Sequence, residues 1–395
     1  MSAPDVAVIG GGVVGTAAAA ILAGEGARVT LYEREAIAAG ASGRNSGVVQ
    51  HPFDPPLVEL YHRTVEVYRM LGAEAPDAGF VLADAPAGLL LLSRRPDEAV
   101  PALAAHLAAR FPDLAPRALG DADLRALEPT LAPGLGACRI EAGFPVVPSA
   151  PTYALASLAE RRGAVLRLGR SAAPAVESGR CVGVRVGGSN QVEPAGAVLV
   201  TAGPWSALVI DPSGTWQPIR QVWGVVAETI MASPPRHVLE EAEMDEALGI
   251  GARGFTGDAP APAAPTADAE NGPRFSLMTA AGRSVAGSTF LEGDQPELRP
   301  WVERILRHGA EFVPALADAP IREVRACARP VALDGRPLIG AVPGIEHLYL
   351  CAGHGPWGIS TGPGSAQLLA DVVLGRPAQI NPAFDPGRFG PVTTD

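Results

Sequence analysis

The feature that most constrains this chain is a glycine-rich turn, GGGVVG at residues 10–15. It follows a short apolar run at 5–9, typical of a buried parallel strand, and it opens an alanine-rich helix expected over 16–23. A second expected strand, 28–32, leads to Glu33, which lies 18 residues after the last glycine of the turn. That spacing is close to the roughly 20 residues expected before a ribose-binding acid. The segment therefore predicts a βαβ unit that binds a dinucleotide.

The three glycines of the motif, Gly10, Gly12 and Gly15, have separate tasks in such a unit. The first permits the tight turn, the second lets a pyrophosphate approach the backbone, and the third lets the helix pack closely on the strand. The helix N-terminus adds N–H donors and a positive dipole. The motif alone does not separate FAD from NAD.

Composition indicates a globular protein with more than one core. The chain has 395 residues, 47% hydrophobic and 18% charged, which suits two domains or one large domain with an inserted one. Its net charge of −11 argues against a general affinity for nucleic acid or anionic membranes. The apolar start lacks a basic region, and no apolar run reaches the roughly 20 residues of a membrane span. We therefore expect a soluble, cytoplasmic protein.

The sequence contains no lysine, so all 31 basic residues are arginine. This excludes a Schiff-base lysine, a phosphate-binding lysine of the Walker type and a lysine general base. The four cysteines are far apart and form no CxxC pair. They therefore predict neither a metal site nor a disulfide framework.

The pattern changes in the second half of the chain. From about 217 to 316 it becomes short strands and turns with a few helices, which predicts a separate substrate domain. Within it, the Ala/Pro-rich stretch 258–271 predicts a mobile surface loop. Helices are expected at 56–71, 101–110, 121–127, 152–162 and 364–374, and strands at 88–93, 165–168, 182–186, 197–201, within 322–340 and at 347–353.

Four segments, taken in order, resemble one family. They are VAVIGGGVVG…LYERE near the start, GASGRNSGVV at 40–49, VLVTAGPWS at 198–206, and the run at 327–377 that opens with CARPVALDGRPLIG. With them the chain resembles the D-amino acid oxidase superfamily of FAD-dependent oxidoreductases, in the branch with glycine oxidase and monomeric sarcosine oxidase. The resemblance covers both ends and the middle, and it is poor over about 100 central residues.

The resemblance implies an α/β plus α+β fold with two domains. A discontinuous, Rossmann-like FAD-binding domain would take residues 1–82, 145–215 and 322–395. A substrate domain built on an antiparallel sheet would take 83–144 and 216–321.

The resemblance also implies which residues hold FAD. The glycine-rich turn and the acid after the second strand would hold the ADP half, and the last helix would bring its N-terminus towards the flavin ring. The dipole of that helix would stabilise negative charge on the reduced flavin. The implied set is Gly10, Gly12, Val13, Val14, Gly15, Glu33, Arg34, Ser42, Gly43, Arg44, Asn45, Ser46, Val176, Ala202, Gly203, Trp205, Cys327, Gly353, His354, Gly355, Gly358 and Ile359.

Arg329 is the expected substrate-binding residue. It stands in Ala-Arg-Pro, where glycine oxidase-like enzymes place an arginine that binds the substrate carboxylate. A guanidinium suits this task because its planar fork donates two parallel hydrogen bonds and stays charged. The alternative is a structural ion pair with an acid in the core.

Cys327 is a second residue with two interpretations. It lies seven residues before Asp334, the spacing of the cysteine that bonds covalently to the flavin in monomeric sarcosine oxidases. The alternative is a small buried side chain, since free cysteine packs well in cores. We expect FAD to be bound without a covalent bond, with a link through Cys327 as the other possibility.

His354 and His51 are the candidate acid–base groups, because histidine titrates near neutrality. His354 has the alternative of orienting the flavin or closing a turn. Trp223 and Trp357 are candidates for an apolar pocket, with membership of the core as the alternative.

The resemblance implies an enzyme that oxidises the C–N bond of a small amino acid or secondary amine of the glycine, sarcosine or D-amino acid type. A hydride would pass to flavin N5 and the imine product would hydrolyse, with O2 or another acceptor taking the electrons. Sarcosine oxidase-type enzymes use a lysine to promote the reaction with oxygen, and this chain has none. The alternatives are a dehydrogenase with another acceptor, a 2-hydroxy acid or a larger natural-product amine as substrate, an NAD(P) dehydrogenase, and a non-catalytic flavin-binding subunit. The oligomeric state is left open.

Overall fold

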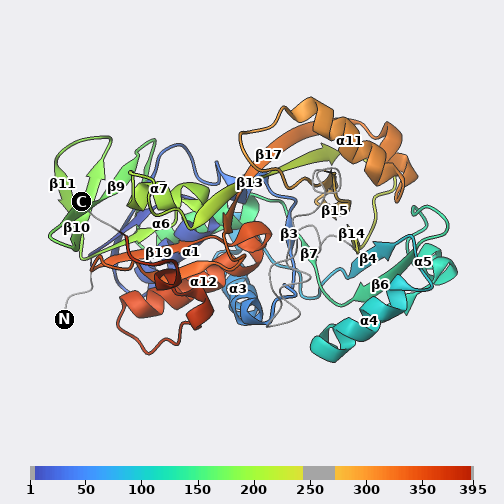
Figure 1. The fold of residues 1–395 in the computed structure, drawn as a ribbon, viewed down its shortest axis with the longest axis horizontal. Helices are drawn as coiled ribbons and strands as arrows, with labels where there is room; N and C mark the ends of the chain where they lie inside the picture. The colour runs from blue at the N-terminus through green and yellow to red at the C-terminus, as the bar shows by residue number, and fades with distance from the viewer. Residues whose placement is uncertain (1–4, 243–271, 393–395) are drawn as a thin grey trace.

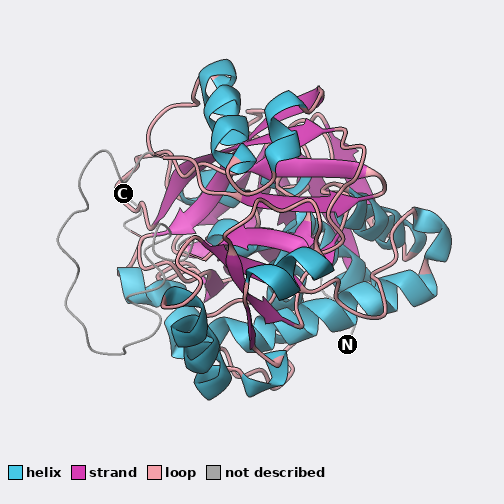
Figure 2. Ribbon diagram, turned by 90° about the vertical axis from the view of Figure 1, so that its right-hand side faces the viewer, coloured by secondary structure: helices cyan, strands magenta, loops and turns pink. Residues whose placement is uncertain are grey.

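The computed structural model describes residues 5–242 and 272–392. The predicted loop at 258–271 lies outside these residues. Most helices lie at the periphery and the strands of two large sheets run through the interior (Figures 1 and 2). None of the described helices is both long and apolar enough to cross a bilayer.

A six-stranded sheet forms one half of the molecule (Figure 1). Its order is β18-β19-β12-β1-β2-β8, and every neighbouring pair except β18–β19 is parallel. The strands are β1 (Asp5–Ile9), β2 (Arg28–Glu33), β8 (Val165–Leu168), β12 (Ala197–Val200), β18 (Leu338–Ala341) and β19 (Leu348–Ala352). They come from three distant parts of the chain, which confirms the expected Rossmann-like arrangement.

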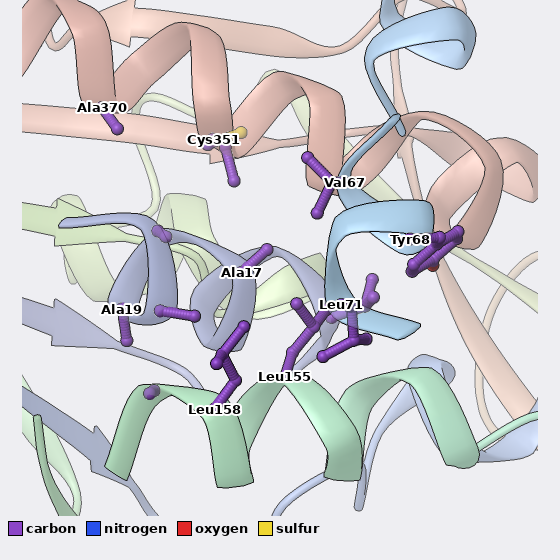
Figure 3. Packing of buried hydrophobic residues seen from close by; sticks show 14 of the residues in the cluster. Ala17, Ala19, Val67, Tyr68, Leu71, Leu155, Leu158, Cys351 and Ala370 are labelled. Carbon is purple, nitrogen blue, oxygen red and sulfur yellow. The ribbon is translucent and has the colours of Figure 1, made fainter. Parts of the chain in front are cut away.

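Successive residues of β1 face two different cores. Val6 and Val8 belong to one apolar cluster, whereas Ala7 and Ile9 belong to another. Burial on both faces explains why this strand is continuously apolar. The first face is covered by four helices whose packing Figure 3 shows: α1 (Val13–Gly24), α3 (Pro55–Glu74), α6 (Ala150–Arg161) and α12 (Gly358–Val373). The second is covered by β9 (Ala172–Glu177), β10 (Arg180–Val186), β11 (Val192–Pro194) and α7 (Ser206–Ile210).

Helix α12 starts at Gly358, earlier than the start at 364 that the sequence predicted. It passes through Pro363, which cannot donate the usual backbone hydrogen bond to the carbonyl of Ile359. The hydroxyl of Tyr68, on α3, donates to that carbonyl instead, at 2.8 Å. A long-range side chain thus satisfies the carbonyl that the proline leaves without a donor, and the local sequence gave no sign of it.

The second half of the molecule is an eight-stranded sheet in the order β17-β13-β16-β15-β14-β4-β6-β5. All neighbours are antiparallel except β14 and β4. The strands are β4 (Leu89–Ser93), β5 (Arg117–Leu119), β6 (Gly136–Ile140), β13 (Ile219–Thr229), β14 (Val238–Glu241), β15 (Ser276–Ala280), β16 (Arg283–Gly287) and β17 (Ile321–Ala332). Helices α4 (Ala99–Arg110), α5 (Asp121–Leu127) and α11 (Leu298–Ala310) are in contact with this sheet. Between the two halves lie three short elements: α2 (Ala41–Arg44), β3 (Val48–Val49) and β7 (Phe144–Pro145). The mixed fold class is confirmed.

Strand β17 connects the two halves. It pairs with β13 along its whole length, from Ile219↔Ala332 to Thr229↔Ile321. The expected boundaries assign 322–395 to the cofactor domain, yet this strand belongs to the eight-stranded sheet. Strand β13, with 11 residues, also contrasts with the short strands expected between 217 and 316. The division into domains itself stays a prediction.

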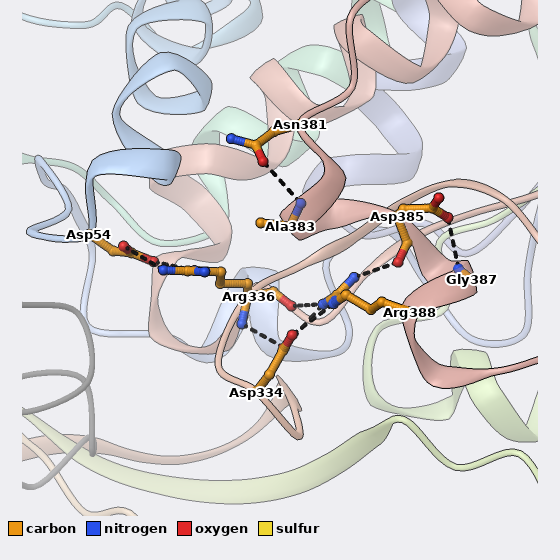
Figure 4. A network of polar contacts seen from close by, with 8 residues as sticks. All are labelled: Asp54, Asp334, Arg336, Asn381, Ala383, Asp385, Gly387 and Arg388. Atoms are coloured by element: carbon orange, nitrogen blue, oxygen red, sulfur yellow. Dashed lines mark hydrogen bonds and ion pairs between the residues drawn. The ribbon is translucent and has the colours of Figure 1, made fainter. Parts of the chain in front are cut away.

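A polar network fastens the turn after β17 (Figure 4). Arg336 donates to the carboxylate of Asp54, just before α3, with a Nε–Oδ2 distance of 2.9 Å. Arg388, near the end of the described chain, pairs with Asp334 at 2.7 Å and donates to the Arg336 carbonyl. These contacts hold the turn between β17 and β18 against the helical face of the first half.

Candidate functional site

A cavity of about 570 Å³ lies where the two halves meet. Its walls come from the turn between β1 and α1, from α2, from the turn after β12, from β17 and from the start of α12. This volume is within the range of roughly 300–1,000 Å³ found for sites of small molecules and cofactors.

The glycine-rich turn lies at one end of the cavity. At two of its positions, Gly10 and Gly15, the surrounding atoms leave no space for a side chain. Gly10 has φ +116°, and a Cβ there would lie 2.6 Å from the carbonyl oxygen of Thr201. A Cβ on Gly15 would lie 2.0 Å from the Gly10 carbonyl oxygen. The first glycine therefore allows the turn and the third allows α1 to approach β1, as the sequence predicted.

The N-terminus of α1 faces the cavity with no side-chain cap at Gly12 and no acid in its first turn. Ser42 accepts a hydrogen bond from the Val13 amide at 2.9 Å. The carboxylate of Glu33 accepts the Gly11 amide at 2.7 Å and so lies at the edge of the turn. A helix N-terminus with an adjacent acid has the donors that a pyrophosphate needs and the acceptor that ribose hydroxyls need.

Two cations also line the cavity. The Arg34 guanidinium stacks over the ring of Trp205, 4.1 Å from its centroid. Arg44, in α2, is exposed and lines the cavity. The glycine cradle, the helix N-terminus and these cations together fit the ADP half of FAD.

The cavity brings together most of the residues that the sequence singled out. Those that line it are Gly10, Gly12, Val13, Val14, Glu33, Arg34, Ser42, Arg44, Asn45, Ser46, Ala202, Gly203, Trp205, Cys327, Arg329, His354, Gly355, Gly358, Ile359, Trp223 and Trp357. Gly15, Gly43 and Gly353 lie behind its wall.

Val176 and His51 do not line the cavity. Val176 packs against the second core, and the preceding segment, 170–172, lines the cavity in its place. A strand carries its side chains to alternate faces, so a local pattern does not say which part of a strand and its turn reaches a site.

His51 lies in an aromatic cluster beside the cavity. Its ring contacts Tyr61 and Phe111, with centroids 5.1 and 5.4 Å away, and its Nδ1 is buried with no hydrogen-bond partner. Burial, helped by the neighbouring His62, lowers the pKa of His51 to about 4. The histidine is thus neutral at pH 7, and within residues 5–242 and 272–392 no group of the cavity is hydrogen-bonded to its Nδ1.

His51 should make the protein sensitive to acid. Because its pKa is about 4 when folded and about 6.5 when unfolded, only the unfolded chain takes up the proton between these values. His51 therefore costs no stability above about pH 6.5, and the free energy of unfolding falls as the pH drops from there towards 4. Replacing His51 with phenylalanine should reduce the loss of unfolding free energy between pH 7.5 and pH 5 by about 2 kcal/mol, measured by urea unfolding. The control is His106→Gln on the exposed face of α4; equal losses in wild type and His51→Phe would contradict this account.

Arg329 lies in the cavity wall and is almost fully buried. Its Nη1 donates to the Thr289 carbonyl at 2.7 Å and its Nη2 donates to the Ser288 hydroxyl at 2.5 Å. The guanidinium also stacks on Phe290, 4.4 Å from the ring centroid. Burial lowers the pKa of Arg329. Among the described residues it forms no salt bridge, which removes the alternative of an ion pair with a core acid within them.

Gly224 makes room for this guanidinium. It lies on the neighbouring strand β13, and a Cβ there would lie 2.2 Å from Nη2 of Arg329. The obstructing atoms are the end of a flexible side chain, so an added methyl group would displace the guanidinium and leave the strands in place.

Gly224→Ala should therefore weaken the binding of a carboxylate ligand at least about tenfold while the thermal midpoint stays the same or rises slightly, since Ala is less costly than Gly in a strand. Titration with acetate or benzoate, followed by the flavin absorbance, measures this. Gly120→Ala, whose Cβ would meet no atom within 4 Å, is the control. Unchanged carboxylate affinity in Gly224→Ala would refute the assignment.

His354 and Cys327 complete the wall near Arg329. His354 is buried and its Nε2 is 3.0 Å from the hydroxyl of Ser365, which donates to the Thr361 carbonyl. This leaves Nε2 as the donor and Nδ1 as the acceptor of the neutral ring. Burial lowers the pKa of His354 to about 4 and raises the pKa of the Cys327 thiol.

Sequence reasoning missed several residues of the wall. Gln50, Glu240, Ser276, Met278, Ser288 and Phe290 line the cavity. Gln50 directly follows the segment 40–49, so the end of that segment was an available signal. The other five come from the region that resembles the family least, and strand pairing brings them together.

Comparison with known proteins shows which proteins share this sequence pattern. The family model described as DAO, FAD dependent oxidoreductase, matches residues 5–372. Glycine oxidase of Pseudomonas aeruginosa is 28% identical over 98% of this chain and 98% of its own length. The uncharacterized oxidoreductase YurR of Bacillus subtilis is 29% identical over 68% of this chain, and the match spans 66% of its own length. A D-amino acid dehydrogenase of Allorhizobium ampelinum is 31% identical over 60% of this chain, and the match spans 52% of its own length.

Solved structures share the fold over nearly the whole chain. Iminodiacetate oxidase from Chelativorans has a TM-score of 0.77 and 26% identity, with 96% of this chain and 98% of that one covered. Glycine oxidase from Geobacillus kaustophilus has a TM-score of 0.79 and 23% identity, with both chains fully covered.

Proposed function

The chain belongs to the DAO family of FAD dependent oxidoreductases, and from this premise we propose that it oxidises the C–N bond of a small amine that carries a carboxylate. The observation that carries the proposal is Arg329, a buried cation in the cavity wall that forms no salt bridge among the described residues. Placing a charge there is costly unless an anion meets it. The names of the relatives and structures above contain glycine, iminodiacetate and D-amino acids. Each of these compounds carries a carboxylate beside an amine.

Bound FAD supplies the acceptor for the hydride that leaves the carbon beside the nitrogen. The residues of this chain bind and orient the substrate. The guanidinium of Arg329 holds the carboxylate by charge-assisted hydrogen bonds. The neutral ring of His354, whose Nε2 is committed to Ser365, has its Nδ1 left to accept a hydrogen bond from the amine N–H of the substrate. Trp223 and Trp357 line the cavity and exclude water from it.

We propose that FAD is held without a covalent bond. The thiolate is the nucleophilic form of cysteine, and burial raises the pKa of Cys327, which keeps the thiol protonated at neutral pH. Precipitation with acid should release the flavin into the supernatant. Yellow colour retained by the pellet would favour the covalent link.

Anaerobic reduction of the flavin by a panel of compounds tests the proposed activity. The panel would contain glycine, sarcosine, D-alanine, proline, iminodiacetate, a 2-hydroxy acid, and benzylamine as an amine without a carboxylate. We expect bleaching of the flavin absorbance by carboxylate-bearing amines and not by benzylamine. Bleaching by benzylamine at a similar rate would overturn the role of the carboxylate, and no bleaching by any compound would favour a non-catalytic subunit.

A dehydrogenase is the second candidate, favoured by the absence of lysine from the chain. Oxygen then has no lysine ammonium to assist its reduction. Admitting air to the bleached protein separates the two candidates: return of the absorbance within seconds would support an oxidase, and return only after addition of an artificial acceptor would support a dehydrogenase.

A further inference from the structure

The guanidinium of Arg329 is held along one of its edges by two neutral acceptors. Its Nη1 donates to the Thr289 carbonyl at 2.7 Å and its Nη2 donates to the Ser288 hydroxyl at 2.5 Å. That hydroxyl itself donates to the Thr289 carbonyl at 3.3 Å, so the two acceptors lie side by side. Acceptors this close together match only the two parallel N–H bonds at the end of the guanidinium fork. The edge formed by Nη1 and Nη2 is therefore occupied by the protein itself.

The edge that remains is formed by Nε and the second N–H of Nη2. A guanidinium carries five N–H donors in one plane, and the two contacts with Ser288 and Thr289 use two of them. Within residues 5–242 and 272–392, no side chain or carbonyl accepts a hydrogen bond from Nε of Arg329. Since Arg329 lines the cavity, a carboxylate that enters has this second edge to bind, again through two parallel hydrogen bonds. The hydroxyl and the carbonyl on the first edge are uncharged, so they leave the positive charge for such a ligand.

The acceptors are fastened to the strand on which the guanidinium lies. The Thr289 hydroxyl accepts a hydrogen bond from the Val225 amide at 2.9 Å and donates to the Trp223 carbonyl at 3.1 Å, so it is tied to β13 on either side of Gly224. A Cβ on Gly224 would lie at nearly equal distances, 2.2, 2.4 and 2.5 Å, from Nη2, Cζ and Nη1 of Arg329. Gly224 therefore faces the flat side of the guanidinium. The surface under the guanidinium and the acceptors at its end belong to one hydrogen-bonded unit.

We propose that Ser288 is a positioning residue for the substrate carboxylate. Its hydroxyl, which is buried, occupies the Nη1–Nη2 edge of Arg329 together with the Thr289 carbonyl, and so presents the Nε–Nη2 edge to the ligand. Without the hydroxyl, one N–H of Nη2 loses its acceptor and the guanidinium is free to turn about its side-chain bonds, so binding must pay for orienting it. This inference rests on the proposed function, because it takes the carboxylate at Arg329 as given.

The first test identifies the edge that binds, by NMR of the Nε–H groups in FAD-loaded protein whose arginines carry nitrogen-15. The signal of Arg329 is the one missing from Arg329→Lys. Addition of acetate should move this signal downfield, because its proton enters a charge-assisted hydrogen bond, and the shift should saturate together with the change in flavin absorbance. Acetate that saturates the absorbance change and leaves the Arg329 signal in place would overturn the assignment of the edge.

The second test is the acetate affinity of Ser288→Ala, which should fall about tenfold while the flavin content and the thermal midpoint change little. Ser288→Thr keeps the hydroxyl and should restore the affinity. Ser276→Ala is the matched control: Ser276 is another buried serine that lines the cavity, and its removal should change the affinity by less than about threefold.

Two results would overturn the role of Ser288: wild-type affinity in Ser288→Ala, or an equal loss in Ser276→Ala. The proposed function fails separately, if Arg329→Met binds acetate as tightly as wild type does.

Discussion

Replacing Arg329 with methionine is expected to lower the second-order rate constant of flavin reduction by carboxylate-bearing amines by roughly 100- to 1,000-fold. The substrate carboxylate would enter a buried site without a partner, and the lost charge-assisted hydrogen bonds act in both binding and reaction. Arg329→Lys should recover only part of the rate, because an ammonium does not reproduce the planar fork of a guanidinium. Stopped-flow measurement of flavin bleaching under anaerobic conditions gives these rates.

The stability of the Arg329→Met variant is not expected to fall with its rate. Burial lowers the pKa of Arg329, because its charged form is disfavoured away from water. Methionine fills the space beside Phe290 without a charge, so the free energy of unfolding should not fall and the thermal midpoint should be equal or higher. A loss of stability together with the loss of rate would instead mark Arg329 as a structural residue.

Gly15→Ala has the second large expected effect, loss of bound FAD. Its Cβ would lie 2.0 Å from the Gly10 carbonyl oxygen and 2.6 Å from Oγ1 of Thr201. The Gly10 backbone and the buried Thr201 cannot shift easily, so α1 must move away from β1. The N-terminus of α1 would then no longer lie at the cavity wall. The purified variant should have a flavin absorbance near zero, and its thermal midpoint should be lower than that of wild-type protein stripped of flavin.

Gly12→Ala is the graded comparison for this prediction. A Cβ there would be 3.1 Å from Oγ of Ser42, which is a side-chain atom and not part of the backbone. Its fold should survive and only its flavin affinity should fall. If Gly15→Ala retained flavin and melted like wild type, the close packing of α1 on β1 would not be what forms the nucleotide end.

The fold of the βαβ unit at the proposed nucleotide end was predictable because its signal is local. The strand, the turn with Gly10, the helix and Glu33 follow one another within 30 residues, and short-range geometry fixes how they lie. Arg329 was found by resemblance, and the structure adds what the resemblance did not contain: the space at Gly224 and the hydrogen bond to Ser288.

What could not be predicted depends on contacts between distant residues. Glu240 reaches the cavity only because β14 pairs with β15, and no motif around it indicates a site. The start of α12 was placed too late because Pro363 is normally a boundary signal, and the compensating hydroxyl of Tyr68 lies almost 300 residues away. His51 was chosen for its titration near neutrality, whereas its burial among aromatic rings removes that property.

Strand β17 carries Cys327 and Arg329 on the same face, two residues and about 6.6 Å apart, and Val331 forms a bridge with His354. One stiff element therefore contributes to both the cofactor end and the substrate end of the cavity. We expect occupation of one end to restrain this strand, and the two proposed binding equilibria would then be thermodynamically linked. By reciprocity, any factor by which a carboxylate ligand tightens the hold on FAD is also the factor by which FAD tightens the hold on that ligand.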